Sequence, residues 1–147
     1  MTRQKHSRGY ELMDHCQAKA EGRAMLIAAG FYLVLCEYRN ADLVGFRRAG
    51  NRIYVLTLEF ERTVRNVLRN IRRNLSNGSD FVLEVCMTPS AKVSAQRLIR
   101  RKLRPDEQKK VRVVQSDELN IELLRSLNGE TRVDSGCIEP CFGMIRG

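Results

Sequence analysis

The sequence predicts an α/β domain built on a mixed five-stranded sheet with helices on both faces. Three segments with strand character, residues 31–36, 41–46 and 52–60, follow one another without an intervening helix. After residue 62, segments with helical spacing alternate with short apolar segments. Strands joined by short turns pair as antiparallel neighbours, whereas strand–helix alternation is typical of parallel strands. The two patterns in one chain therefore indicate a mixed sheet.

The N-terminal third predicts one helix and three strands. Apolar residues recur at three- and four-residue steps over residues 10–29, and Gly30 suits the end of that helix. Residues 31–36 (FYLVLC) are continuously apolar, which predicts a strand covered on both faces. The strands at 41–46 and 52–60 are separated by RRAGN, a composition that favours a tight turn. The expected buried stripe of the helix is Met13, Cys16, Ala20, Ala24 and Ile27.

The second half of the chain predicts three helices in alternation with two strands. The helices cover residues 63–75, 91–103 and 117–127, and the strands cover residues 81–87 and 111–114. A buried stripe on the first of these helices would pack it against the sheet. Its members are Val64, Val67, Leu68, Ile71 and Leu75.

One compact domain accounts for most of the 147 residues. We assign residues 1–127 to that domain and residues 128–147, which are aperiodic and contain glycine and cysteine, to a C-terminal tail. No segment approaches the roughly 18 apolar residues of a membrane span. The basic N-terminus lacks the apolar stretch of a secretory signal. We therefore expect a cytoplasmic protein with no membrane partner.

The five cysteines do not form an obvious framework. Cys16, Cys36 and Cys86 lie within apolar patterns, which is typical of small core residues. Cys137 and Cys141 form a single C-x3-C pair without a second pair or a nearby histidine, so they indicate a zinc site only weakly. The chain also lacks glycine-rich phosphate-binding motifs, and we expect no nucleotide cofactor.

Positive charge is concentrated in one third of the chain. Residues 62–112 contain 14 Lys/Arg and 4 Asp/Glu, a net charge of +10, while the remaining residues contain 12 Lys/Arg and 13 Asp/Glu, a net charge of −1. A basic excess confined to one region favours a polyanionic partner such as DNA. A solvated surface that maintains solubility is the alternative.

Three acidic residues stand near the ends of predicted strands. Asp42 opens the strand at 41–46, and Glu59 and Glu61 end the strand at 52–60. Side chains alternate along a strand, so Glu59 and Glu61 point to the same face. Carboxylates at the end of a buried strand are costly unless they are paired, and a divalent cation is one such partner. Alternatively, the two glutamates occupy the solvent face of an edge strand and pair with nearby arginines.

The predicted helix at 63–75 is rich in arginine and asparagine away from its apolar stripe. Arginine binds phosphate through two parallel hydrogen bonds. Asparagine is a poor helix former, so Asn66, Asn70 and Asn74, spaced four apart, suggest a purpose. They suit contacts to sugar or base edges, or hydrogen bonds to neighbouring strands or to a second subunit. The candidate nucleic-acid-binding residues are Arg62, Arg65, Asn66, Arg69, Asn70, Arg72 and Arg73.

The element order and the acidic residues together resemble the PD-(D/E)xK nuclease superfamily, which has the restriction-endonuclease-like αβββαβ core. The chain is similar to its small archaeal and mobile-element members, relatives of Holliday junction resolvases, over about residues 9–115. Asp42, in NADLVGF, matches the first metal-binding acid, and Glu59, in LTLEFE, matches the second. The resemblance implies a Mg²⁺ (or Mn²⁺) ion held by Asp42, Glu59 and the carbonyl of Phe60.

Glu61 departs from the pattern of this superfamily. The motif normally ends in a lysine two positions after the second acid, and this chain has Glu61 there. Lys19 or Arg62 could supply the missing cation. Glu21 could correspond to the acid of the family's first helix, and His15 shares a helix face with Lys19. Asp42, Glu59, Glu61, Lys19 and Glu21 are therefore the candidate catalytic residues.

Two functions follow from the resemblance. The first is a Mg²⁺-dependent endonuclease that hydrolyses DNA phosphodiester bonds. Its candidate substrates are branched DNA and the DNA intermediates of recombination and repair. The second is a catalytically inactive protein of the same fold that binds nucleic acid through its basic helix. Two-fold dimers are common among resolvase-like relatives, so the resemblance also allows a homodimer.

Overall fold

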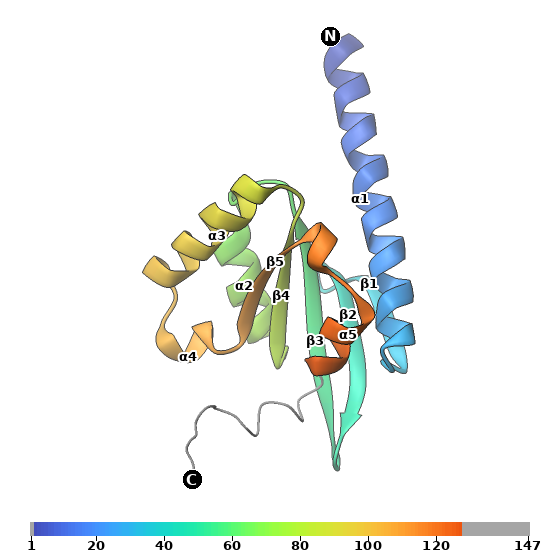
Figure 1. The fold of residues 1–147 in the computed structure, drawn as a ribbon, viewed down its shortest axis with the longest axis vertical. Helices are drawn as coiled ribbons and strands as arrows, with labels where there is room; N and C mark the ends of the chain where they lie inside the picture. Colours follow the sequence, from blue (N-terminus) through green and yellow to red (C-terminus); the bar gives the residue numbers. More distant parts are fainter. Residues whose placement is uncertain (1, 128–147) are drawn as a thin grey trace.

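A five-stranded mixed sheet forms the centre of the molecule (Figure 1). The computed structural model describes the backbone of residues 2–127 and the side chains of residues 15–127. The sheet contains β1 (Leu33–Tyr38), β2 (Ala41–Ala49), β3 (Arg52–Glu61), β4 (Phe81–Cys86) and β5 (Val111–Gln115). The helical elements are α1 (Thr2–Ala28), α2 (Val67–Ser76), α3 (Pro89–Lys102), α4 (Pro105–Gln108), the 3-10 helix η1 (Ser116–Glu118) and α5 (Ile121–Ser126).

The strands lie in sequence order across the sheet. β1, β2 and β3 form an antiparallel meander, and β4 and β5 continue the sheet parallel to β3. The α/β class and the mixed five-stranded sheet are thus confirmed. The turn between β2 and β3 falls where the sequence predicts it, with Ala49 opposite Arg52 and Gly50 at a positive φ of 67°.

Helices cover both faces of the sheet, and each face has its own core. α1 and α5 pack on one face through a cluster that includes Leu26, Leu58 and Leu124. α2 and α3 pack on the other face with Val82 and Cys86 of β4. Because strand side chains alternate, Glu59 on β3, between Leu58 and Phe60, and Glu84 on β4, midway between Val82 and Cys86, point toward α2.

The buried face of α1 differs from the predicted one. Gly22, Leu26 and Ala29 face the sheet, and a Cβ atom at Gly22 would lie 2.9 Å from Phe60 Cζ. The helix therefore approaches β3 along the side that carries its glycine, because a larger residue would not fit there. Four of the five predicted stripe residues are exposed, and Met13 lies outside the described side chains. The exposed residues are Cys16, Ala20, Ala24 and Ile27.

β1 is an edge strand and is not covered on both faces, so that prediction was wrong. Leu33 is 44% exposed, and Cys36 is also exposed. Continuous apolar sequence does not distinguish an edge strand from a central one. The core assignment is therefore wrong for Cys16 and Cys36 and confirmed for Cys86.

Several boundaries also differ from the prediction. α1 begins at Thr2, α2 begins at Val67 rather than at residue 63, and the short α4 was not predicted. The tail at residues 128–147, with its two cysteines, lies outside the described residues. Among the helices that the structure describes, none combines the length and the apolar character needed to cross a bilayer.

Candidate functional site

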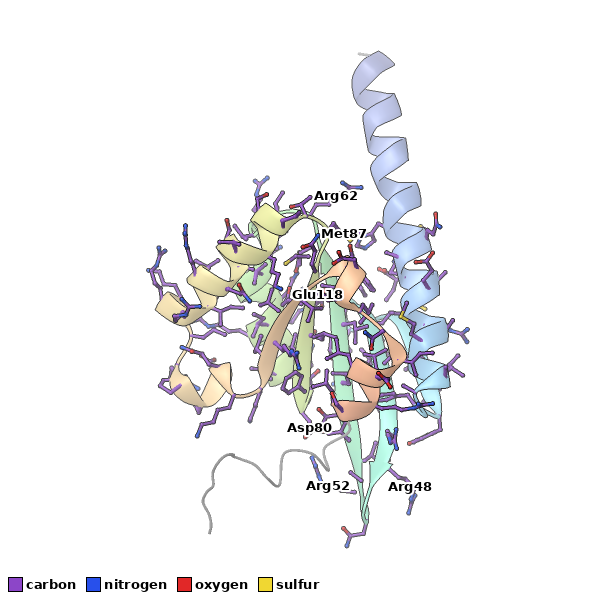
Figure 2. All side chains as sticks on the ribbon, viewed as in Figure 1. Arg48, Arg52, Arg62, Asp80, Met87 and Glu118 are labelled. Carbon is purple, nitrogen blue, oxygen red and sulfur yellow. The ribbon has the colours of Figure 1, made fainter. Side chains whose placement is uncertain are left out.

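The acidic residues gather where the parallel strands β3 and β4 end. Glu61 is the last residue of β3, and its carbonyl accepts a hydrogen bond from the backbone N–H of Met87, 2.9 Å away. Figure 2 shows Met87 at this end of the sheet, together with Arg62, while Arg52 and Asp80 mark the opposite end. The carboxyl ends of parallel strands are the usual position of sites in open α/β sheets.

Glu59 is buried and held by α2. Only 3% of its surface is exposed, and its Oε2 accepts hydrogen bonds from Asn74 Nδ2 at 2.6 Å and Arg73 Nη2 at 3.1 Å. Burial is the main cause that raises the pKa of Glu59 to about 7, and the charges of Asp42 and Glu61 act in the same direction, against the lowering effects of the Asn74 hydrogen bond and the Arg73 charge. Asn74 and Arg73 therefore only partly offset the cost of burying this carboxylate.

Glu61 of β3 and Glu84 of β4 form a second pair of buried carboxyl groups next to Glu59. Glu84 of β4 lies opposite Glu59 in the parallel register and is fully buried. Burial, followed by the charge of Glu61, raises the pKa of Glu84 well above its usual range. Neither oxygen of Glu84 has a hydrogen-bond donor among the described residues. The carboxyl group of Glu61 lies within reach of Glu84, and the two groups can share a hydrogen bond only if one of the two carboxyls is protonated. Glu61 Oε2 itself accepts from Asn70 Nδ2 at 2.8 Å.

Asp42 lies at the point where β2 leaves its pairing with β3. Its Oδ2 accepts a hydrogen bond from the backbone N–H of Phe60 at 2.8 Å, and its Oδ1 lies 3.1 Å from His15 Nε2 of α1. The His15 ring stands edge-on to the Phe60 ring, with the two centroids 6.3 Å apart. α1 thus brings a histidine to the first acid of the predicted motif.

The backbone of Phe60 contacts Asp42 through its N–H group. Along a strand, the N–H and C=O of one residue face the same neighbour, and successive residues face opposite neighbours. The carbonyl of Glu61 faces β4, where it meets Met87, and the N–H of Phe60 faces Asp42. The Phe60 carbonyl therefore lies on the same side of β3 as Asp42, and Phe60 directly follows Glu59 in the chain.

Two other candidate residues point elsewhere. Lys19 bonds to Glu37 of β1, and that hydrogen bond raises the pKa of Lys19. Glu21 is exposed and accepts a hydrogen bond from Gln17 at 3.2 Å. Arg62 is exposed. The described contacts place Arg73 against the second acid, Glu59, and place Lys19 against Glu37.

α2 divides its polar residues between the acids and the surface. Asn70, Arg73 and Asn74 turn toward Glu59 and Glu61, so two of the three evenly spaced asparagines hydrogen-bond a neighbouring strand, one of the alternatives that the sequence left open. Asn66 is half-buried. Four arginines on α2 and in the segment just before it are exposed. These exposed residues are Arg62, Arg65, Arg69 and Arg72.

The exposed arginines of α2 lie beside a second basic helix. Arg72 Nη2 donates to the carbonyl of Lys102 at the end of α3, 3.0 Å away, which ties the two helices together. We call the exposed basic side chains of α2 and α3 the basic surface. Its α3 members are Arg97, Arg100, Arg101 and Lys102.

The residues at this end of the sheet fit a Mg²⁺ ion in their chemistry. Mg²⁺ prefers hard oxygen ligands and commonly uses one or two carboxylates, with water and phosphate completing its coordination. Asp42, Glu59 and the Phe60 carbonyl are ligands of that kind, and Glu84 adds a buried carboxyl group whose oxygens have no donor among the described residues. Within residues 15–127, no group of three or more His, Cys, Asp or Glu side chains is placed to hold a metal ion.

Sequence reasoning missed two features of this site. Glu84 was not identified, although a single carboxyl in the apolar segment FVLEVCM is unusual for a buried strand. The contact of His15 with Asp42 was also missed, because the spacing of residues on α1 does not reveal which strand the helix crosses. Glu59 and Glu61 were left open as a solvent-exposed edge pair, but both are buried on β3, a central strand.

Comparisons with known proteins do not assign the chain to a family. No protein-family model, no curated protein and no solved structure matches it.

Proposed function

We propose that the protein is a Mg²⁺-dependent endonuclease of the PD-(D/E)xK type acting on DNA. The observation that carries this proposal is the hydrogen bond from the Phe60 N–H to Asp42, which brings the first acid to the residue after Glu59, at the ends of the parallel strands. The order of elements, with an antiparallel meander continued by parallel strands, agrees with the αβββαβ core that the resemblance implies. Mn²⁺ would satisfy the same oxygen ligands.

The charge balance at the site supports a bound cation. Four carboxyl groups lie at this end of the sheet, and the side-chain contacts described for them include one arginine, Arg73. Despite Arg73 and Asn74, the pKa of Glu59 stays near 7 and that of Glu84 stays well above its usual range. A divalent cation would favour the ionised form of Glu59 and offset the cost of its burial.

The surrounding residues fix the geometry of the two acids. Asn74 and Arg73 hold one oxygen of Glu59, while the Phe60 N–H and His15 hold the oxygens of Asp42. His15, Asn74 and Arg73 are therefore positioning residues for the carboxylates. When bound, the metal would polarise the scissile phosphate and supply an ionised water. The basic surface on α2 and α3 would hold the DNA backbone without reading its sequence.

The alternative is a protein that binds nucleic acid without cutting it. The specific observation in its favour is Glu61, which stands where the motif lysine is expected and is held by Asn70 at 2.8 Å. Under this alternative the carboxylates are structural, and α2 restrains them with its own amides and arginine. The basic surface would then carry the function alone.

Cleavage of labelled DNA distinguishes the two functions. Linear, nicked and four-way DNA are incubated with Mg²⁺ and with wild-type protein, Glu59→Gln or Asp42→Asn. The nuclease proposal expects metal-dependent cleavage that falls by more than about 100-fold in both variants, because even outer-shell partners of a metal are worth about 10- to 100-fold. Glu122→Gln, an exposed change on α5, is the matched control and should cleave as wild type does.

Binding measured on the same DNA completes the test. Uncleaved but bound DNA, with affinity unchanged in Glu59→Gln, would reject the nuclease and favour the non-cutting protein. Both functions predict that Arg69→Ala weakens binding and reduces the slope of log affinity against log salt by about one. If DNA does not bind at all, both functions are wrong.

A further inference from the structure

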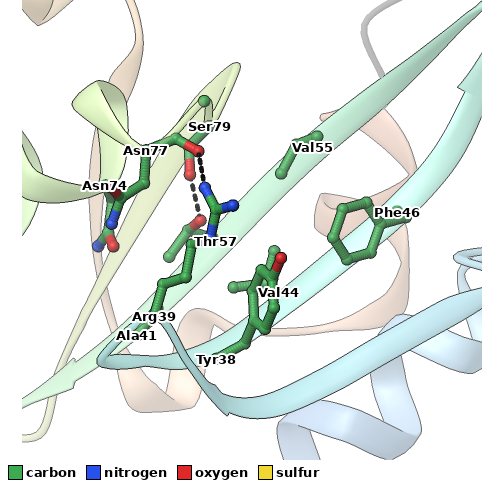
Figure 3. A pocket seen from close by; sticks show the side chains of 11 residues that line it. Tyr38, Arg39, Ala41, Val44, Phe46, Val55, Thr57, Asn74, Asn77 and Ser79 are labelled. Atoms are coloured by element: carbon green, nitrogen blue, oxygen red, sulfur yellow. Dashed lines mark hydrogen bonds between the residues drawn. The ribbon is translucent and has the colours of Figure 1, made fainter.

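A cavity of about 150 Å³ lies beside the acidic site, on the α2 face of the sheet. Its apolar lining comes from neighbouring strands and includes Val44, Phe46 and Val55 (Figure 3). Thr57 and Ser79 hydrogen-bond to each other at its edge. The end of β1 contributes Tyr38, and its ring stands at 73° to that of Phe46, with centroids 6.4 Å apart. The cavity thus has aromatic and aliphatic walls with a polar rim.

Arg39 extends over this cavity from a constrained backbone. Arg39 and Asn40 form the two-residue turn between β1 and β2, and both have positive φ, 52° and 67°. Asparagine tolerates this conformation, whereas arginine pays a steric cost there. Non-glycine residues held at positive φ cluster at functional sites. The conformation aims the Arg39 side chain at the cavity, as Figure 3 shows.

The guanidinium of Arg39 has N–H donors that its described contacts do not use. It lies over the Tyr38 ring, 5.4 Å from the centroid, and its Nη1 donates to the carbonyl of Asn77 at 3.2 Å. These are its contacts among the described residues, and a guanidinium carries five N–H donors. Arg39 therefore links the two sides of the cavity mouth and retains donors for a ligand.

We propose that this cavity binds one unpaired pyrimidine base of the nucleic acid. Cavities of roughly 150 Å³ accept a single aromatic ring, so a pyrimidine fits this cavity better than the larger, two-ring purine. Bases stack on aromatic side chains, here Tyr38 and Phe46. The amides and hydroxyls of the rim can hydrogen-bond the base edge.

The position of the cavity connects it to the proposed nuclease. Asn74 lines the cavity and also donates to Glu59, so the two sites share one side chain. Arg73 donates to the carbonyl of Asn40, which fixes the turn that carries Arg39. A base in the cavity would therefore place its own sugar and phosphate near the acids. This inference rests on the proposed function for its nucleic-acid partner but not for the chemistry of cleavage.

Fluorescence anisotropy with short single-stranded DNA tests the inference in the full-length protein. Oligothymidine is compared with oligoadenine and with an abasic oligomer of the same length and charge, in EDTA and at one salt concentration. We expect oligothymidine to bind roughly tenfold tighter than the abasic oligomer, because stacking of one base on an aromatic side chain is worth about a factor of ten or more. Oligoadenine should bind as the abasic oligomer does.

Two exposed variants locate the effect. Tyr38→Ala and Arg39→Ala should reduce the preference for oligothymidine to less than about threefold while leaving the abasic oligomer bound. Tyr32→Ala and Arg48→Ala remove an exposed aromatic ring and an exposed positive charge elsewhere, and should keep the preference. Circular dichroism of each variant confirms that it is folded.

The outcomes separate the cavity from the proposed function. Equal affinity for thymine, adenine and abasic oligomers would overturn the cavity inference and leave the nuclease proposal intact. A preference that survives Tyr38→Ala and Arg39→Ala would overturn it too, because the base would then bind elsewhere. If the cavity instead binds an aromatic side chain of another protein and shows no preference among the oligomers, the cavity inference is likewise overturned. If none of the oligomers binds, the nucleic-acid partner itself is wrong.

Discussion

Glu59→Gln should make the protein more stable at neutral and alkaline pH. The folded protein holds the pKa of Glu59 at about 7, above its ordinary value of 4.5. The unfolded chain therefore releases a proton between these pH values that the folded chain retains. This contribution to stability is greatest below pH 4.5, falls as the pH rises and is fully lost above pH 7. At about 1.4 kcal/mol per pKa unit, the loss amounts to about 3 kcal/mol.

Urea denaturation at pH 4.5, 6 and 8, in EDTA, measures this effect. Glutamine keeps the size and the accepting oxygen of Glu59 but does not ionise. The difference in free energy of unfolding between Glu59→Gln and wild type should therefore increase by about 3 kcal/mol, in favour of the variant, from pH 4.5 to pH 8. Glu122→Gln, on the exposed side of α5, should follow wild type at every pH. Parallel curves for wild type and Glu59→Gln would show that Glu59 ionises as freely in the folded protein as in the unfolded one, and would refute this reasoning.

The other predictions concern the metal, Glu84 and Gly22. Millimolar Mg²⁺ at pH 7 should raise the melting temperature of wild type but not of Asp42→Asn, and an equal rise in both would place the ion elsewhere. Glu84→Gln should flatten the fall in stability as pH rises above 4.5, measured by urea denaturation, because its raised pKa has the same sign as that of Glu59. Gly22→Val should cost about 1–3 kcal/mol by pushing α1 from Phe60 and should slow cleavage, whereas Ala20→Val, on the exposed side, should leave both unchanged.

The order of the elements was predictable because each strand and helix has a clear local pattern. The three consecutive strands, the turn at RRAGN and the packed stripe of α2 were all predicted, and Val67 and Ile71 are fully buried. The face of α1 was not. Its apolar residues follow helical spacing on the exposed side, and close packing at Gly22 determines which side faces the sheet. Periodicity records hydrophobicity, and it contains no information about where a neighbour needs space.

The candidate site was predictable as a set of residues but not as a network. Alternation along the strand correctly places Glu59 and Glu61 on one face, and the spacing of asparagines on α2 correctly marks a special edge of that helix. Which donor meets which acid depends on the parallel register of β3 and β4 and on the angle of α2. Both are tertiary properties, so Arg73 could be predicted as a surface arginine and is found against Glu59.

Asn74 couples ligand binding in the cavity to the ionisation of Glu59. Its amide donates to Glu59 at 2.6 Å and forms part of the cavity wall. A ligand that strengthens this hydrogen bond must lower the pKa of Glu59, and ionisation of Glu59 must then tighten the same ligand by the same factor, because linkage is reciprocal. The affinity of the cavity for such a ligand would therefore vary with pH around 7, although none of the cavity's other lining residues needs to titrate there. Through one buried amide, the binding of such a ligand and the ionisation of Glu59 would be linked equilibria.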